Sequence, residues 1–116
     1  MGNPICHFEI CSSNMEKARE FYGGLFNWKL RIDENMNYTI IETVDGGVGG
    51  GIMQAEEGKF PPYVSFYVQV DDLDASTRKA EEMGAKIIVP PMPIPGYGRF
   101  SFFSDFDGNM IGLWSK

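Results

Sequence analysis

The second half of this 116-residue sequence repeats the pattern of its first half, and this internal duplication limits the folds that are open to the chain. The stretch 7–10 aligns with 65–68, a displacement of 58 positions. Each copy begins with strict apolar–polar alternation, which is typical of a strand, and continues with apolar residues at helical spacing. Two similar modules can form a cleft that neither has alone, so a functional site should draw on matching positions of both.

Each copy reads as one strand, one helix and three further strands. The expected helices lie near residues 13–23 and 72–83, with capping boxes at Ser13 and Asp71 and helix ends at Gly23-Gly24 and Gly84. The expected strands are 5–11, 28–32, 38–44 and 48–54, then 64–70, 86–89, 99–104 and 110–114. The sequence therefore predicts an α+β fold: one domain, 1–116, built from βαβββ modules 1–56 and 62–116.

The first strand of each module has two distinct faces. A helix that crosses over the strand should pack on Phe8 and Ile10 in the first module, and on Phe66 and Val68 in the second. The opposite face should then line a cleft between the modules, with polar or reactive side chains from both copies: His7, Glu9, Cys11, Ser65, Tyr67 and Gln69.

Charge and composition exclude several classes of partner. The formal net charge is −6 and the ten Lys and Arg residues are scattered, which argues against a nucleic-acid partner. The chain has no apolar run of about 18 residues, so we expect no membrane span. Cys6 and Cys11 lie too far apart on one extended strand for a disulfide, and no signal peptide is visible. We expect a cytoplasmic protein with reduced thiols.

Two irregular segments frame the expected cleft. Residues 90–98 hold four prolines and two glycines, which rules out a central strand. This segment either connects two strands on the surface or forms a lid that brings Tyr97 and Arg99 over the cleft. The glycine run 46–51 is followed by a strand and by no Lys-Ser or Lys-Thr, so it is not a phosphate-binding loop.

The paired modules, the opening His7, the dipeptide Phe21-Tyr22 and the closing Asp105–Asn109 together resemble the vicinal oxygen chelate superfamily. This superfamily includes glyoxalase I, extradiol dioxygenases, fosfomycin-resistance enzymes and bleomycin-binding proteins. The resemblance covers nearly the whole chain and is strongest with the small, single-domain, glyoxalase-like branch. It implies curved mixed sheets around a cleft. Phe106 stands where the closing motif usually has proline.

The resemblance also implies where a metal would bind. The metal-using members take one ligand from the first strand and one from the last strand of each module. Carried over to this sequence, those positions are His7, Gly50, Ser65 and Gly112. Only His7 is a candidate metal ligand, and protein metal sites generally need three or more. We therefore expect neither a divalent metal nor another cofactor.

Three hypotheses follow for the function. The first is a metal-free protein that binds a small organic molecule, with Ser65, Tyr67, Gln69, Tyr97 and Arg99 as ligand-binding residues. The second is a lyase, isomerase or dioxygenase in which His7 and Glu9 are catalytic, with an unorthodox metal set or with acid–base chemistry alone. The third is a fold retained for assembly or regulation, its cleft filled by its own side chains. A homodimer is expected because an open sheet leaves edges to be covered.

Overall fold

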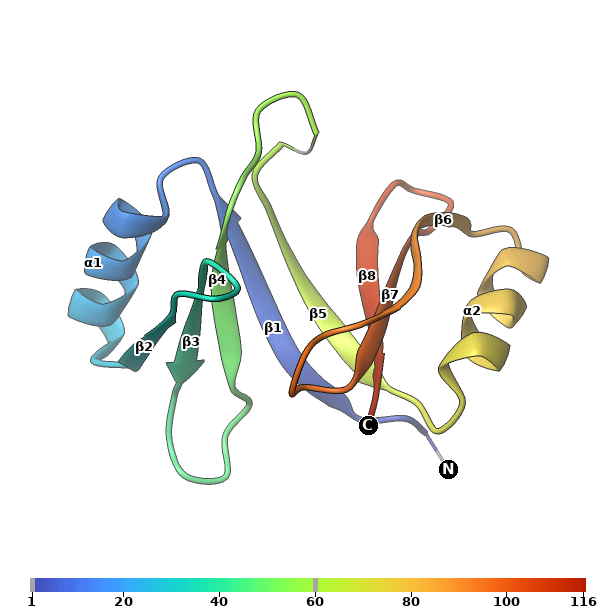
Figure 1. Ribbon diagram of the computed structural model, residues 1–116, viewed down its shortest axis with the longest axis horizontal. Coiled ribbons are helices and arrows are strands. Elements are labelled where there is room, and N and C mark those ends of the chain that lie inside the picture. The colour runs from blue at the N-terminus through green and yellow to red at the C-terminus, as the bar shows by residue number, and fades with distance from the viewer. Residues whose placement is uncertain (1, 60) are drawn as a thin grey trace. The chain divides into compact units, whose positions relative to one another are not determined.

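The computed structural model describes residues 2–59 and 61–116 and forms two compact units. One unit is His7–Val64, and the other combines the segment up to Cys6 with Ser65–Lys116. Each unit holds one βαβββ module, so the predicted α+β class and module pattern are confirmed (Figure 1).

The first module forms a mixed four-stranded sheet with one helix. Its elements, in chain order, are β1 (Ile5–Ser12), α1 (Met15–Phe26), β2 (Lys29–Asp33), β3 (Tyr38–Glu42) and β4 (Gly50–Gln54). The strand order is β2-β3-β4-β1, in which β1 and β4 are parallel and the other neighbours are antiparallel. The parallel pair requires a crossover, and α1 lies in that connection.

The second module repeats this arrangement. Its elements are β5 (Tyr63–Gln69), α2 (Leu73–Glu82), β6 (Lys86–Pro93), β7 (Arg99–Ser104) and β8 (Met110–Ser115). The order is β5-β8-β7-β6, again with one parallel pair, β5 and β8. The start of the chain also belongs to this unit: the Gln69 N–H donates to the Pro4 carbonyl, and the Cys6 thiol donates to the Tyr67 carbonyl.

Helix α1 packs on the predicted face of β1. Met15 and Ala18 form a buried cluster with Ile41 and Ile52, and Phe8 and Ile10 pack against it, among other partly buried side chains. In the second module Val68 packs on a smaller cluster of Val70, Leu73 and Leu113, as predicted. Phe66 is 36% exposed, contrary to the prediction.

The helix ends differ from the prediction in three ways. The N-caps are Asn14 and Asp72, one residue later than Ser13 and Asp71, and each side chain accepts the expected backbone N–H. Gly23-Gly24 lies inside α1, which ends at Asn27 in the left-handed conformation. Because asparagine tolerates that conformation, no glycine was needed there. The apolar residues at helical spacing run to Leu25 in the first copy and Met83 in the second, and both of these side chains are exposed.

Strand β6 is longer than predicted. It continues through Pro90, Pro91 and Pro93 with two register shifts against β7, although the sequence prediction ended the strand at Val89. It is the outer strand of its sheet, so the missing N–H groups leave no central ladder broken. The prediction that this segment cannot be a central strand is confirmed.

Within residues 2–59 and 61–116, no helix is long and apolar enough to span a membrane.

Candidate functional site

The polar face of β1 holds two ionisable side chains that are almost fully buried. Glu9 and Cys11 are 4% and 2% exposed, and His7 is half-buried. These side chains alternate with Phe8 and Ile10, which face α1. The sequence placed them on one face correctly, and two of the three side chains are almost fully buried.

Hydrogen bonds connect two of the predicted residues through a third side chain. The Tyr38 hydroxyl donates to Glu9 Oε1 at 3.0 Å and lies 2.8 Å from His7 Nε2. The Tyr63 hydroxyl donates to Glu9 Oε2 at 2.6 Å. We call these four residues, His7, Tyr38, Glu9 and Tyr63, the tyrosine–carboxylate network.

The hydrogen positions in this network follow from counting donors. With Glu9 ionised, its carboxylate accepts the single hydroxyl hydrogen of Tyr38, and the Tyr38 oxygen then accepts from His7 Nε2. Burial lowers the pKa of His7 below its usual 6.5, which favours the neutral ring near pH 7. The neutral tautomer therefore carries its hydrogen on Nε2. The network has a direction, from His7 through Tyr38 to Glu9.

The sheet register corrects one assignment made from the sequence. Glu9 pairs with Gly51 across β1 and β4, and its counterpart Tyr67 pairs with Gly112 across β5 and β8. The first-module match to Gly112 is therefore Gly51, whereas the sequence prediction named Gly50. Gly50 faces the other way, because a Cβ built on it would overlap the Phe8 ring. The chemistry expected at that position is unchanged, because both residues are glycine.

Tyrosine rings occupy the space beside both of these glycines. A Cβ on Gly51 would overlap the Tyr38 ring, and a Cβ on Gly112 would overlap the Tyr67 ring. Glycine within a strand often leaves room for a ligand or for another part of the backbone. In the structure the protein's own side chains use that room.

A metal does not fit the residues at these positions. At His7, Gly51, Ser65 and Gly112, imidazole is the only strong ligand. The Ser65 hydroxyl donates to the Met110 carbonyl. In the described part of the chain, no group of three or more His, Cys, Asp or Glu side chains is placed to hold a metal ion.

Two of the second-module candidates, Tyr67 and Gln69, make contacts within their own unit. Tyr67 is 9% exposed, and its ring stacks on Phe102 with ring centroids 5.6 Å apart. Gln69 pairs with Trp114 in the β5–β8 ladder. The predicted role of Ser65, Tyr67 and Gln69 in binding a ligand stays a prediction.

The two predicted lid residues lie at the hairpin between β6 and β7. The Tyr97 carbonyl accepts a hydrogen bond from the Trp114 indole N–H. Both terminal nitrogens of Arg99 lie 3.2 Å from the Asp74 carboxylate at the start of α2. This hydrogen-bonded arginine holds the pKa of Asp74 below its usual value. Whether the hairpin closes over a ligand stays a prediction.

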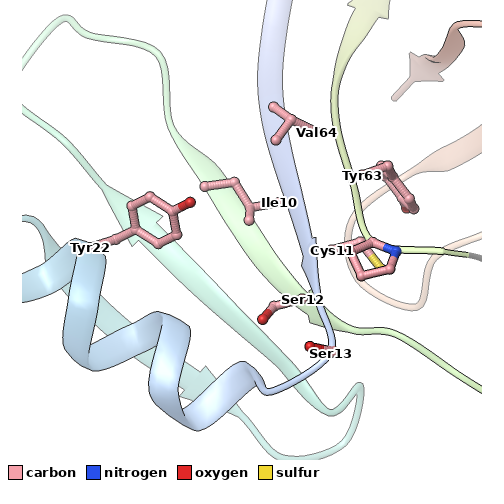
Figure 2. A pocket seen from close by; sticks show the side chains of 8 residues that line it. Ile10, Cys11, Ser12, Ser13, Tyr22, Tyr63 and Val64 are labelled. Carbon is pink, nitrogen blue, oxygen red and sulfur yellow. The ribbon is translucent and has the colours of Figure 1, made fainter.

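A groove of about 330 Å³ lies on the first unit, near the end of β1. In Figure 2 the Tyr22 ring reaches from α1 toward Ile10, and Val64 lies across from it. The remaining lining residues are Cys11, Ser12, Ser13, Pro62 and Tyr63. Tyr63 therefore borders the groove and also holds the carboxylate of Glu9.

Sequence reasoning missed the two tyrosines that hold Glu9. Tyr38 has a detectable signal, because it begins a strand whose alternation places it on the polar face, near glycine in the next strand. Tyr63 directly follows Pro61 and Pro62, between the expected strands 48–54 and 64–70, and no local pattern indicates that it reaches Glu9.

Comparison with known proteins identifies the family that this fold and site belong to. The model for the Glyoxalase/Bleomycin resistance protein/Dioxygenase superfamily matches residues 5–113. The chain is 33% identical over 108 residues to CFP32 of Mycobacterium tuberculosis, covering 90% of this chain and 41% of that protein. It is 26% identical over 135 residues to the anthracycline biosynthesis protein DnrV of Streptomyces peucetius, covering 94% and 46%.

Solved structures share the fold. Methylmalonyl-CoA epimerase from Mycobacterium tuberculosis superposes with a TM-score of 0.70 at 18% identity, covering 96% of this chain and 86% of that one. The chain therefore belongs to the Glyoxalase/Bleomycin resistance protein/Dioxygenase superfamily, as the sequence resemblance implied. It spans less than half the length of the curated relatives CFP32 and DnrV.

Proposed function

We propose that this chain binds a small, neutral, largely aromatic molecule and does so without a metal. One observation carries the metal-free part. Gly51 and Gly112 stand at the last-strand ligand positions, and the rings of Tyr38 and Tyr67 fill the space beside them. A metal there would have at most His7 and Glu9 of one strand as strong protein ligands, and protein metal sites generally need three or more.

The side chains of the polar β1 face support the proposed ligand class. The rings of His7 and Tyr38 are nearly parallel, with an interplanar angle of 22° and centroids 6.2 Å apart. Aromatic surfaces of this kind suit flat rings. The Glu9 carboxylate and the net charge of −6 disfavour an anionic ligand. The relative DnrV is named as an anthracycline biosynthesis protein, and anthracyclines are flat, polycyclic molecules.

The sequence prediction of an inter-module cleft is part of this proposal. In that prediction Ser65, Tyr67 and Gln69 contact the ligand from the second module. The hairpin that carries Tyr97 and Arg99 closes over it.

Calorimetry with two matched probes tests the proposal. A hydroxyanthraquinone should bind at least about tenfold more tightly than its carboxylate-bearing analogue, since the anion would meet Glu9. His7→Ala and Tyr38→Phe should each weaken binding by about 1–3 kcal/mol. Phe106→Ser is the control, because Phe106 is 92% exposed.

Two results would overturn the proposal. Elemental analysis could find near-stoichiometric zinc, nickel, iron or manganese that disappears in His7→Ala. Alternatively, both variants could bind the neutral probe as tightly as the unchanged protein.

The second candidate function is metal-free acid–base catalysis, and the tyrosine–carboxylate network favours it. Tyr38 is placed to relay a proton between the imidazole of His7 and the carboxylate of Glu9. Methylmalonyl-CoA epimerase shares this fold, and its name describes an epimerase. Proton exchange at carbon is therefore a reasonable class of reaction to test. NMR would follow deuterium uptake next to the carbonyl of small thioesters and ketones. Exchange that is lost in Tyr38→Phe supports catalysis, and binding without exchange excludes it for those compounds.

A cytoplasmic location also belongs to the proposal. Cys6 and Cys11 are free thiols in the structure, which suits a reducing compartment. Fractionation of the host cell with an antibody against this chain would test the location.

A further inference from the structure

The outer strands of the two sheets differ in how they expose their backbone edges. In the second module the outer strand β6 carries three prolines, which cannot donate backbone hydrogen bonds, and its register against β7 shifts twice. These features block strand addition. In the first module the outer strand is β2, Lys29–Asp33, which contains no proline and pairs with β3 in a regular five-residue register. The β2 edge is therefore competent for pairing with another strand.

The sequence of β2 is complementary to itself when it is read in the opposite direction. In an antiparallel pair centred on Arg31, Lys29 of each copy stands opposite Asp33 of the other. Leu30 stands opposite Ile32. Directly opposed residues in antiparallel strands interact, and opposite charges there are favourable. This register uses the whole strand, and it places opposite charges at both ends with apolar pairs between them and the centre.

Arg31 meets its own copy at the centre of this pairing, where like charges oppose each other. Glu42 lies on β3 directly opposite Lys29 and is a diagonal neighbour of Arg31 on the same face. Diagonal neighbours are roughly 7–8 Å apart at Cα, within reach of an arginine side chain. A depression of about 410 Å³ at this edge is lined by Lys29, Leu30, Arg31 and Glu42 and gives the guanidinium groups space.

Apolar side chains flank the same edge on the helix side. Ile32 is 53% exposed, and it shares its face of the sheet with Leu30, against which α1 packs at Gly23. The last turns of α1 expose Leu25 and Phe26 by 60% and 51%. Figure 1 shows α1 beside β2. Apolar residues gathered at a pairing-competent edge mark an interaction surface.

We propose that two copies of this chain form a twofold dimer by antiparallel pairing of β2 with β2, centred on Arg31. The pairing joins the two first-module sheets into one continuous sheet, with both α1 helices on the same face. A second copy is the partner because the charges and apolar residues of β2 match those of β2 itself. This dimer does not depend on the proposed ligand, whose binding residues in the first module lie on β1 and β3.

Light scattering after size exclusion, across the micromolar range, is the first test, and it should give the mass of a dimer. Lys29→Asp sets a new carboxylate against the carboxylate of Asp33 at both ends of the pairing, so the dimer dissociation constant should rise at least about tenfold. The matched control is Lys86→Asp on the blocked outer strand β6, which should leave the dimer intact. Circular dichroism would show that both variants are folded.

Cysteine cross-linking tests the register. Directly opposed residues have Cα atoms about 4.5–5.5 Å apart, a separation that a disulfide can bridge. Arg31→Cys should therefore form a covalent dimer on mild oxidation, and Lys29→Cys should not, because position 29 faces position 33. A monomer mass throughout the range, or cross-linking of Lys29→Cys as fast as Arg31→Cys, would overturn the proposal.

Discussion

Removing the Tyr63 hydroxyl should destabilise the protein by far more than removal of a hydroxyl usually does. Tyr63→Phe deletes one donor 2.6 Å from Oε2 of Glu9, a carboxylate that is only 4% exposed. A hydrogen bond to a charged group contributes about 1.5–3 kcal/mol, because the buried acceptor cannot recover the loss from water. For a domain of this size, 1 kcal/mol corresponds to roughly 4 °C in Tm, so we expect a fall of about 6–12 °C.

The assay is urea denaturation of a double-mutant cycle with Glu9→Gln, and Tyr22→Phe is the control. Tyr22 also lies in the first module and packs on its core, and no hydrogen bond of its hydroxyl is seen in the described residues. The control should cost less than about 0.5 kcal/mol. Tyr63→Phe should cost less in the Glu9→Gln background than in the unchanged protein. The reasoning fails if Tyr63→Phe is no worse than Tyr22→Phe, or if the two network changes add within about 0.5 kcal/mol.

Three further predictions concern stability. Gly112→Ala should lower the free energy of unfolding by about 1–3 kcal/mol, because the new methyl group would overlap the buried Tyr67 ring. Gly24→Ala, in open space within α1, should raise it by roughly 0.5–1 kcal/mol. Urea denaturation that changed both free energies in the same direction would contradict this pair of predictions. Asn14→Ala removes the N-cap of α1 and should cost about 1 kcal/mol in thermal denaturation, and an unchanged Tm would argue against the cap. Burial lowers the pKa of His7, so the unfolded chain binds more protons below pH 6.5, and stability should fall as pH decreases from 6.5 toward the folded-state pKa. His7→Gln should flatten that part of the Tm–pH curve, and an unaltered slope would contradict the assignment.

Patterns of short period made most of the fold predictable. Alternation around Phe8 and Ile10 identified a strand and the face that its helix covers, and the duplication then fixed the second module. Helix ends were less predictable because several residues can cap. The N-cap of α1 is Asn14 and not Ser13. The left-handed residue at the end of α1 is Asn27, where glycine was expected. Both errors arise because neighbouring residues of different types can take the same position at a helix end.

The candidate site was predictable only as far as one strand determines it. His7 and Glu9 share a face because strand side chains alternate, and this follows from the sequence alone. Tyr63 reaches Glu9 from 54 residues away, and only tertiary structure brings those atoms together. The choice between Gly50 and Gly51 depended on sheet register, which a run of glycines leaves open because no side chain marks the buried face.

The first residues of the chain bond to the second unit, so their native contacts form late in synthesis. The carbonyl of Pro4 and the thiol of Cys6 bond to Gln69 and Tyr67. These bonds can form only after Tyr67, 61 positions beyond Cys6, has been added and has left the ribosome. Until then the first residues lack their native hydrogen-bond partners. Closing the long loop between them and β5 slows folding. A fragment that begins at residue 62 would lack this segment and leave one edge of β5 uncovered. We expect such a fragment to aggregate, and addition of a peptide that spans residues 2–6 should reduce the aggregation.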